Sequence, residues 1–289
     1  MRYILEYIPL RILIFVLGLF PRDISLKIGK ALGTLACLCM RPRYRLARKN
    51  ILESLPGVSE EKLRRIIIGC WQNLGASAAE LSTLPSLSRE QYLSCFETDG
   101  LEHLKKSHAL GKGLILLAAH YGPWEFSGHL FPLNGIRTAA VARRIKNPYV
   151  DRLVNRFRSF YGNEVILAKN AVRNTMRALK EGKMVCILMD HRVTEGDLQI
   201  PFLGRPAHTT SLPAILALKL KIPIHPVRFW REGTTVKVQA MPAVNFRGIP
   251  DNKEGIKEAT QKMNSILEDW IREKPENWLW IHNRWKIES

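Results

Sequence analysis

The chain has 289 residues, of which 46% are hydrophobic and 24% are charged, a balance that favours a folded body with a buried core over a disordered polypeptide. Its formal net charge of +18 gives the surface a positive field, which suits nucleic acid, anionic lipid or phosphorylated substrates without selecting among them. None of the five cysteines (37, 39, 70, 95 and 186) forms a C-x-x-C pair, so the sequence offers no cysteine metal site of that spacing and indicates a reducing compartment.

The amino-terminal 49 residues are predicted to bind a membrane. Residues 3–20 are largely apolar, with an unbroken run at 12–20, and a second apolar run follows at 28–40. The first run is short for a span, which takes roughly 20 apolar residues, so it either crosses at a tilt or lies in the interface. The basic cluster at 41–49 (RPRYRLARK) favours the cytoplasmic side, and no convincing cleavage site suggests a removed signal peptide. The alternative is a buried amphipathic hairpin.

The remaining residues, 50–289, are predicted to form one α/β catalytic domain with a mixed sheet flanked by helices. Helical spacing appears at 59–84, 149–161, 171–181, 212–220 and 254–274. Short apolar runs at 113–119 and 184–189 suit strands that are buried on both faces, and residues 222–227 and 234–240 read as strands around a turn at 231–233. Strands that alternate with helices argue for an α/β sheet.

One candidate catalytic pair follows the first buried strand. His120 comes directly after residues 113–119, at the sheet edge where α/β proteins usually bind ligands. Pro123 suits the first turn of a helix, which would bring the Glu125 carboxylate to one imidazole nitrogen of His120. The other nitrogen could then take a proton from an attacking alcohol. The pattern predicts acyl transfer to a hydroxyl without a protein nucleophile.

Other interpretations of these residues remain open. A lone histidine at a strand end is often structural, and His120, Glu125 and His129 could instead form a three-ligand metal site. The Walker spacing, the dinucleotide fingerprint and the G-x-S-x-G elbow are all absent from the sequence.

Four ordered blocks resemble the lipid A late acyltransferases, the lauroyl and myristoyl transferases of Gram-negative bacteria. Residues 118–125 (AAHYGPWE) are similar to the His-x4-acid motif of that family, and residues 141–148 (VARRIKNP) are similar to its second block. Asp190, with residues 201–204 (PFLG) and Thr209 with Thr210, resembles the third block. Residues 275–286 (PENWLWIHNRWK) look like the carboxyl-terminal block.

The resemblance implies an acyl carrier protein thioester as donor, a lipid A precursor as acceptor, and no metal or nucleotide cofactor. Both partners are acidic, which suits the basic surface. We assign Arg143 to phosphate or acidic-sugar binding because a guanidinium binds phosphate bidentately. Asp190 is expected to hold an arginine or the substrate, with a structural role as the alternative. Arg284, which falls on a family arginine, is a third candidate for substrate binding, with stacking or a buried ion pair between Trp280 and Trp285 as the alternative. His191, His208, His225 and His282 are expected to be structural. The implied location is the cytoplasmic face of the bacterial inner membrane.

Two departures from the family place the acceptor in question. Isoleucine follows Arg143 and Arg144 where the family often has proline after the first arginine, and the chain ends soon after Lys286. A lysophospholipid, glycerol-phosphate or other glycolipid acyltransferase is therefore the main rival. A nucleic-acid-binding protein would explain the charge, but no helix-turn-helix, zinc or RNA-binding motif appears, so we expect no nucleic-acid partner. A noncatalytic membrane adaptor is a further alternative.

Overall fold

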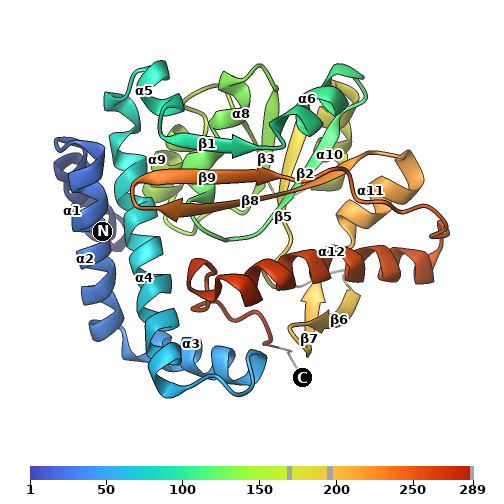
Figure 1. The fold of residues 1–289 in the computed structure, drawn as a ribbon. Helices are drawn as coiled ribbons and strands as arrows, with labels where there is room; N and C mark the ends of the chain where they lie inside the picture. The colour runs from blue at the N-terminus through green and yellow to red at the C-terminus, as the bar shows by residue number, and fades with distance from the viewer. Residues whose placement is uncertain (168–170, 194–197, 287–289) are drawn as a thin grey trace.

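A seven-stranded mixed sheet lies at the centre of the computed structural model, which describes residues 1–167, 171–193 and 198–286. The strand order is β1-β9-β8-β2-β5-β3-β4, and every neighbouring pair is parallel except β8 with β9. A separate antiparallel pair, β6 with β7, lies beside it (Figure 1). The strands are β1 (Phe96–Asp99), β2 (Leu114–Ala118), β3 (Thr138–Ala142), β4 (Glu164–Leu167), β5 (Met184–Leu188), β6 (Leu198–Phe202), β7 (Arg205–Thr209), β8 (Ile224–Glu232) and β9 (Thr235–Ala240).

Helices flank this sheet, as the sequence predicts for an α/β protein. They are α1 (Arg2–Gly18), α2 (Arg22–Cys39), α3 (Arg41–Ser54), α4 (Glu60–Thr83), α5 (Arg89–Leu93), α6 (Leu101–Ala109), α7 (Trp124–Ser127), α8 (Leu130–Leu133), α9 (Pro148–Arg158), α10 (Ala171–Lys180), α11 (Leu212–Leu220) and α12 (Lys253–Glu273), with short 3-10 turns η1 (Leu84–Ser86) and η2 (Pro275–Asn277).

Most of the long predicted elements are confirmed. The helix expected at 59–84 is α4, and Ser59 caps it by accepting a hydrogen bond from the backbone N–H of Lys62 at 3.2 Å. The apolar runs become β2 and β5, which are neighbours in the sheet. The strand expected to end at 227 continues to Glu232, because β9 pairs with it along that whole length. Sequence reasoning missed β1, β3, β4, β6 and β7, which have four or five residues each.

The two faces of β2 contribute to two different cores, because side chains alternate along a strand. Ile115 and Leu117 lie on the face that α4 and α12 cover, and both are fully buried. Leu116 and Ala118 point to the opposite face, towards Phe131 and Phe229. This second face holds the pocket described below.

The amino-terminal helices pack along α4 at one side of the molecule (Figure 1). The backbones of α2 and α4 approach so closely that a Cβ added at Gly33 would lie 2.2 Å from the Trp71 carbonyl oxygen. Glycine is required at such an approach. The predicted boundary at residue 49 falls inside α3, and the division into two units stays a prediction.

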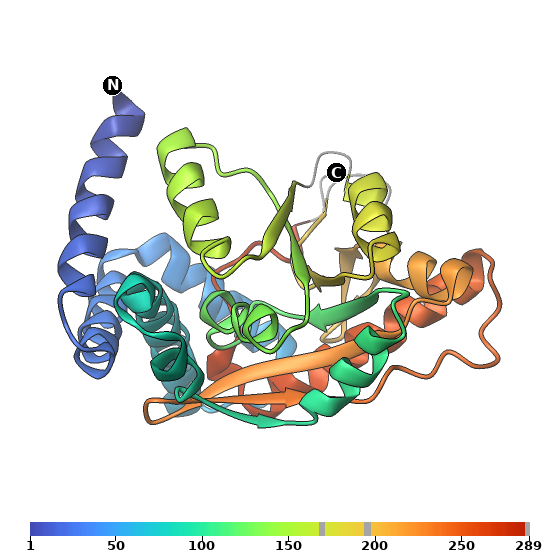
Figure 2. The ribbon, with the colours of Figure 1, turned by 90° about the horizontal axis from the view of Figure 1, so that it is seen from above.

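Helix α1 lies at the edge of the molecule with the N-terminus at its outer end (Figure 2). Its large apolar side chains are mostly exposed, among them Leu5 and Phe15 at 66% and 61%. Across the described part of the chain, no helix combines the length and apolar character needed to cross a membrane.

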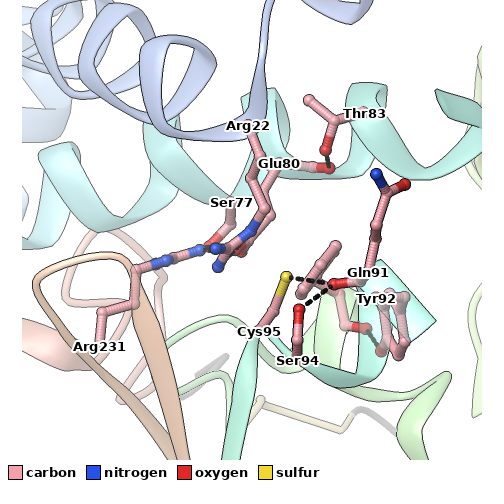
Figure 3. A network of polar contacts seen from close by, with 10 residues as sticks. Arg22, Ser77, Glu80, Thr83, Gln91, Tyr92, Ser94, Cys95 and Arg231 are labelled. Carbon is pink, nitrogen blue, oxygen red and sulfur yellow. Dashed lines mark hydrogen bonds and ion pairs between the residues drawn. The ribbon is translucent and has the colours of Figure 1, made fainter. Parts of the chain in front are cut away.

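A buried carboxylate joins three elements in this part of the fold. Glu80, in α4, is fully buried and pairs with Arg22 at the start of α2 and with Arg231 near the end of β8 (Figure 3). The Arg231 guanidinium also donates to the Ser77 hydroxyl at 3.2 Å. Since two cations share this acid, its removal would leave both without their partner in a region that water scarcely reaches.

Candidate active site

His120 and Asp190 meet at the carboxyl edge of the sheet. Ala118 and Leu188 are paired at the ends of the parallel strands β2 and β5, and each chain continues for two residues to its polar side chain. Asp190 Oδ1 lies 2.9 Å from His120 Nδ1, and Oδ2 accepts a hydrogen bond from the His120 backbone N–H at 2.9 Å. The Trp278 indole N–H donates to the same Oδ2 at 2.8 Å. His120 Nε2 is therefore the ring nitrogen left for substrate.

Asp190 is an ionised acceptor even though it is fully buried. Burial by itself raises the pKa of this carboxyl group, but the charge and hydrogen bond of His120, with His191 and Trp278, lower the pKa well below its ordinary value. A carboxylate in this position fixes the orientation and tautomer of the ring and stabilises the imidazolium.

The turn after His120 is held by backbone contacts with residues 277 and 278. Tyr121 forms an isolated bridge with Trp278, and the Gly122 N–H donates to the Asn277 carbonyl at 2.9 Å. Gly122 has φ +60°, and a Cβ there would lie 2.0 Å from the Phe229 carbonyl oxygen. Only glycine combines the positive φ with this close approach to another strand. The tight turn that it allows lets α7 begin at Trp124, shortly after His120.

The structure corrects the predicted contact between Glu125 and His120. Both Glu125 oxygens accept hydrogen bonds from Arg158 of α9, including Nε to Oε2 at 3.0 Å. Asp190, from the neighbouring strand, occupies the orienting position beside His120 instead. The helix after Pro123 directs Glu125 towards a guanidinium, which is the stronger partner for a half-buried carboxylate. Glu125 nevertheless lines the same pocket as His120.

A pocket of about 410 Å³ opens beside His120 and runs along the second face of the sheet. Its walls are mostly apolar and include Leu116, Ala118 and Leu188. Thr138 and Ala142, at opposite ends of β3, both line it. Four residues of strand span about 13 Å, so the pocket is deep enough for a long apolar chain.

Three arginines line this pocket close to polar groups of the site. Arg158 forms the ion pair with Glu125, while Arg143 is exposed and donates to the Arg192 carbonyl at 3.2 Å. Arg192 is the third. Guanidinium groups beside an apolar cavity suit a ligand with an anionic head and an apolar tail.

Arg284 and Asp190 do not fit direct substrate binding. Arg284 is fully buried, and its guanidinium donates to the carbonyls of His191 and His208 and to Thr209 Oγ1, the last at 2.6 Å. These hydrogen bonds join Arg284 to the segment after β5 and to β7. The expectation that Arg284 and Asp190 touch substrate is corrected because protein groups enclose both.

The three-ligand metal site considered for His120, Glu125 and His129 is not formed. His129 is 1% exposed, and its Nδ1 lies 3.1 Å from Asn163 Nδ2. Burial lowers the pKa of His129 to about 4. Among the residues described, the cluster with metal-ligand donor atoms is instead His120, Asp190 and His191.

Of the four histidines expected to be structural, His225 is held inside the protein by hydrogen bonds, whereas His191 lies in the candidate site. His225 is buried between the Ser107 hydroxyl and the Met241 carbonyl, at 2.8 and 3.0 Å. His191 lines the pocket and lies against His120. Its position next to Asp190 in the sequence was the one available signal, whereas nothing local marks Arg158 or Trp278 as partners of the site.

Comparisons with known proteins find bacterial acyltransferases. A family model described as bacterial lipid A biosynthesis acyltransferase matches residues 1–287. The lipid A biosynthesis lauroyltransferase of Escherichia coli K12 is 25% identical over 294 residues, covering 99% of this chain and 92% of that protein. The lipid A biosynthesis palmitoleoyltransferase of the same strain is 24% identical, covering 92% and 86%. A phosphatidylinositol mannoside acyltransferase of Mycobacterium tuberculosis H37Rv is 23% identical, covering 74% and 68%.

Proposed function

The chain belongs to the bacterial lipid A biosynthesis acyltransferase family, and from that premise we propose that it transfers a fatty acyl chain from an acyl carrier protein thioester to a hydroxyl of a lipid A precursor. The observation that carries the proposal is the His120–Asp190 pair at an apolar pocket bordered by arginines. This combination suits an amphipathic, negatively charged substrate and a reaction that needs a general base.

In the proposed reaction, His120 Nε2 takes the proton from the acceptor hydroxyl while that oxygen attacks the thioester carbonyl. Asp190 stabilises the resulting imidazolium through Nδ1. The tetrahedral intermediate collapses with cleavage of the carbon–sulfur bond, and the leaving thiolate takes the proton back from His120. One ester and one thiol form from one alcohol and one thioester, so atoms and charge balance.

The pocket and its arginines divide the substrates between them in this proposal. The acyl chain lies along the apolar wall formed by residues such as Leu116 and Leu188. Arg143 binds a phosphate or acidic sugar of the acceptor, or the phosphate of the donor's prosthetic arm. The Glu125–Arg158 pair holds α7 and α9 together beside the base, and Glu125 acts as a positioning residue there.

We further propose that the protein binds the cytoplasmic face of the inner membrane peripherally. Leu5, Phe15 and Leu19 are among the exposed apolar side chains of the first helix and its end. Basic residues of α3, including Arg41 and Arg45, are exposed nearby in the sequence and attract anionic lipid. An amphipathic surface of this kind lies in the interface without a spanning helix.

The test is acyl transfer by the purified protein in mixed micelles, with a lipid A precursor as acceptor and acyl carrier protein or coenzyme A thioesters as donors. We expect a product one acyl group heavier by mass spectrometry, and a loss of about 100- to 10,000-fold in His120→Ala. His103→Ala, a change in α6 outside the pocket lining, is the matched control. Retained turnover in His120→Ala would contradict the proposed base.

The relative that acylates phosphatidylinositol mannoside supports a second acceptor class. Parallel reactions with a glycosylated phosphatidylinositol and with a lysophospholipid decide between the classes. Transfer to either one, without transfer to the lipid A precursor, would replace the acceptor and leave the chemistry in place.

A further inference from the structure

Three imidazole rings form one stack beside the pocket. The rings of His120 and His191 have centroids 3.4 Å apart and planes within 2° of parallel. His282 stacks on the other side of the set, with its centroid 3.9 Å from that of His191 and planes 11° apart. The rings come from the segments after β2, after β5 and after η2, so only the tertiary fold brings them together.

Backbone hydrogen bonds hold the segments that carry His191, the middle ring, and His282, the outer ring on the side away from His120. The His191 carbonyl accepts a hydrogen bond from Arg284 Nη1 at 3.3 Å, and the His282 carbonyl accepts one from Asn50 Nδ2 at 3.1 Å. Asn50 and Arg284 are 3% and 0% exposed. Buried side chains therefore fix the two segments that carry His191 and His282.

The parallel arrangement is poorly suited to chelation, although donor atoms of His120, Asp190 and His191 lie within 4.8 Å of one another. An ion shared by rings 3.4 Å apart would lie about 1.7 Å out of each ring plane, nearly the whole length of a ~2.0 Å metal–nitrogen bond. Nitrogen lone pairs lie in the ring plane, so they would miss the ion. The geometry is that of a stack.

The His191 and His282 rings are neutral. Burial lowers the pKa of His191 to about 2. The positive charges of His120 and Arg284 lower this pKa further, and the negative charge of Asp190 opposes them. Burial likewise lowers the pKa of His282 to about 4. The charged and titratable groups that face His191 are His120, Asp190, His282 and Arg284. A neutral ring against His120 adds no second positive charge when the base is protonated.

One ring nitrogen of each of these two histidines lacks a hydrogen bond in the described residues. His191 Nε2 and His282 Nδ1 are buried and have no hydrogen-bond partner within the described portion of the chain. His191 presents the flat face of its ring to His120, and His282 stacks against the opposite face of His191.

We propose that His191, supported by His282, is a positioning residue that holds the plane of the His120 ring so that Nε2 stays directed at the acceptor hydroxyl. The proposal rests on the function proposed above. Asp190 fixes Nδ1 at one edge, and the stack restrains the tilt of the ring about that contact. Because a misplacement of about 1 Å can cost about 100-fold in rate, restraint of the plane is a substantial contribution.

The experiment compares His191→Phe with His191→Leu. Phenylalanine keeps a flat face against His120, whereas leucine fills a similar space without one. We expect kcat to fall by no more than about threefold in the Phe variant and by about 10- to 100-fold in the Leu variant, with KM values for both substrates little changed. His282→Phe and His282→Leu should follow the same order with smaller effects.

The pH profile separates positioning from electrostatics. Since His191 is neutral, His191→Phe should leave the acid limb of the kcat–pH profile in place. His191→Arg should move that limb to lower pH, because a cation stacked on His120 disfavours the imidazolium. Equal losses in the Phe and Leu variants would overturn the proposal, as would a raised KM with an unchanged kcat, which would mean that His191 contacts substrate.

A readout without substrate keeps this test separate from the proposed function. Nitrogen-15 spectra of the His120 ring should show one ordered imidazole in the wild type and in His191→Phe, and exchange broadening in His191→Leu. If the wild type transfers no acyl group to any acceptor, the proposed function fails and the spectra still decide the positioning role. Unchanged spectra in His191→Leu would refute it.

Discussion

Replacing Asp190 by asparagine and Glu125 by glutamine tests which carboxylate acts on the base. The two changes are matched, since each removes one negative charge and keeps nearly the same shape. Asp190 accepts hydrogen bonds from both His120 and Trp278, whereas Glu125 is paired with Arg158. We therefore expect the larger kinetic effect from Asp190→Asn.

The size of that effect follows from the 2.9 Å separation between Asp190 Oδ1 and His120 Nδ1. At an effective dielectric constant of about 20, opposite charges at this distance attract by about 6 kcal/mol, and the hydrogen bond that asparagine retains makes the loss smaller than this. A loss of about 4 kcal/mol of imidazolium stabilisation lowers kcat about 1,000-fold, since about 1.4 kcal/mol corresponds to one factor of ten.

The assay is initial-rate acyl transfer at several pH values, with KM measured for donor and acceptor. Glu125→Gln should raise KM or lower kcat by about tenfold or less, because its carboxylate acts through Arg158. Thermal unfolding of both variants controls for loss of fold. The assignment of Asp190 would be wrong if Asp190→Asn stayed within threefold of wild type while Glu125→Gln lost about 1,000-fold.

Three further predictions concern stability and membrane binding. Glu80→Gln should cost about 3–5 kcal/mol in urea unfolding, because two largely enclosed arginines lose their buried acid. Glu97→Gln, at an exposed pair, should cost less than about 1 kcal/mol, and equal costs in the two variants would contradict the importance of the Glu80 network. His129 has a pKa of about 4 in the folded protein and about 6.5 in the unfolded chain, so the unfolded chain binds a proton first as the pH falls. The free energy of unfolding should therefore fall by about 3 kcal/mol from pH 7 to pH 4. Urea titrations should show a weaker pH dependence in His129→Gln, and an unchanged pH dependence would contradict the burial argument. Phe15→Ser should weaken binding to phosphatidylglycerol-containing vesicles, measured by sedimentation, about tenfold. Leu110→Ser, which changes an apolar side chain at least as exposed but outside the first helices, should leave binding unchanged. Equal binding by the two variants would argue against docking through α1.

The sequence by itself determined the long elements and the principal site residue. Apolar runs that are uniformly buried predicted β2 and β5, and the periodicity of α4 and α12 predicted their length, because these patterns arise from contacts repeated along one segment. The same local reasoning placed His120 at a strand end, and the pairing of β2 with β5 brings Asp190 to the same edge of the sheet.

Only the tertiary structure decided which groups act on His120. Glu125 is five residues away in sequence, but the turn at Gly122 and the short helix α7 direct it to Arg158. Asp190 is 70 residues away and reaches the ring because two parallel strands are neighbours. Spacing along a chain cannot rank these carboxylates, since hydrogen bonds depend on distances in space.

The same limit explains the stacked histidines and the buried arginine. His282 and Arg284 lie in the carboxyl-terminal segment, and their roles depend on contacts with β7 and with the segment after β5. Arg284 was a candidate for substrate binding because it falls on an arginine of the resembling family, which does not tell whether its side chain is exposed or buried. Three acceptors, on His191, His208 and Thr209, compensate for the complete burial of its guanidinium, and only the fold brings them to Arg284.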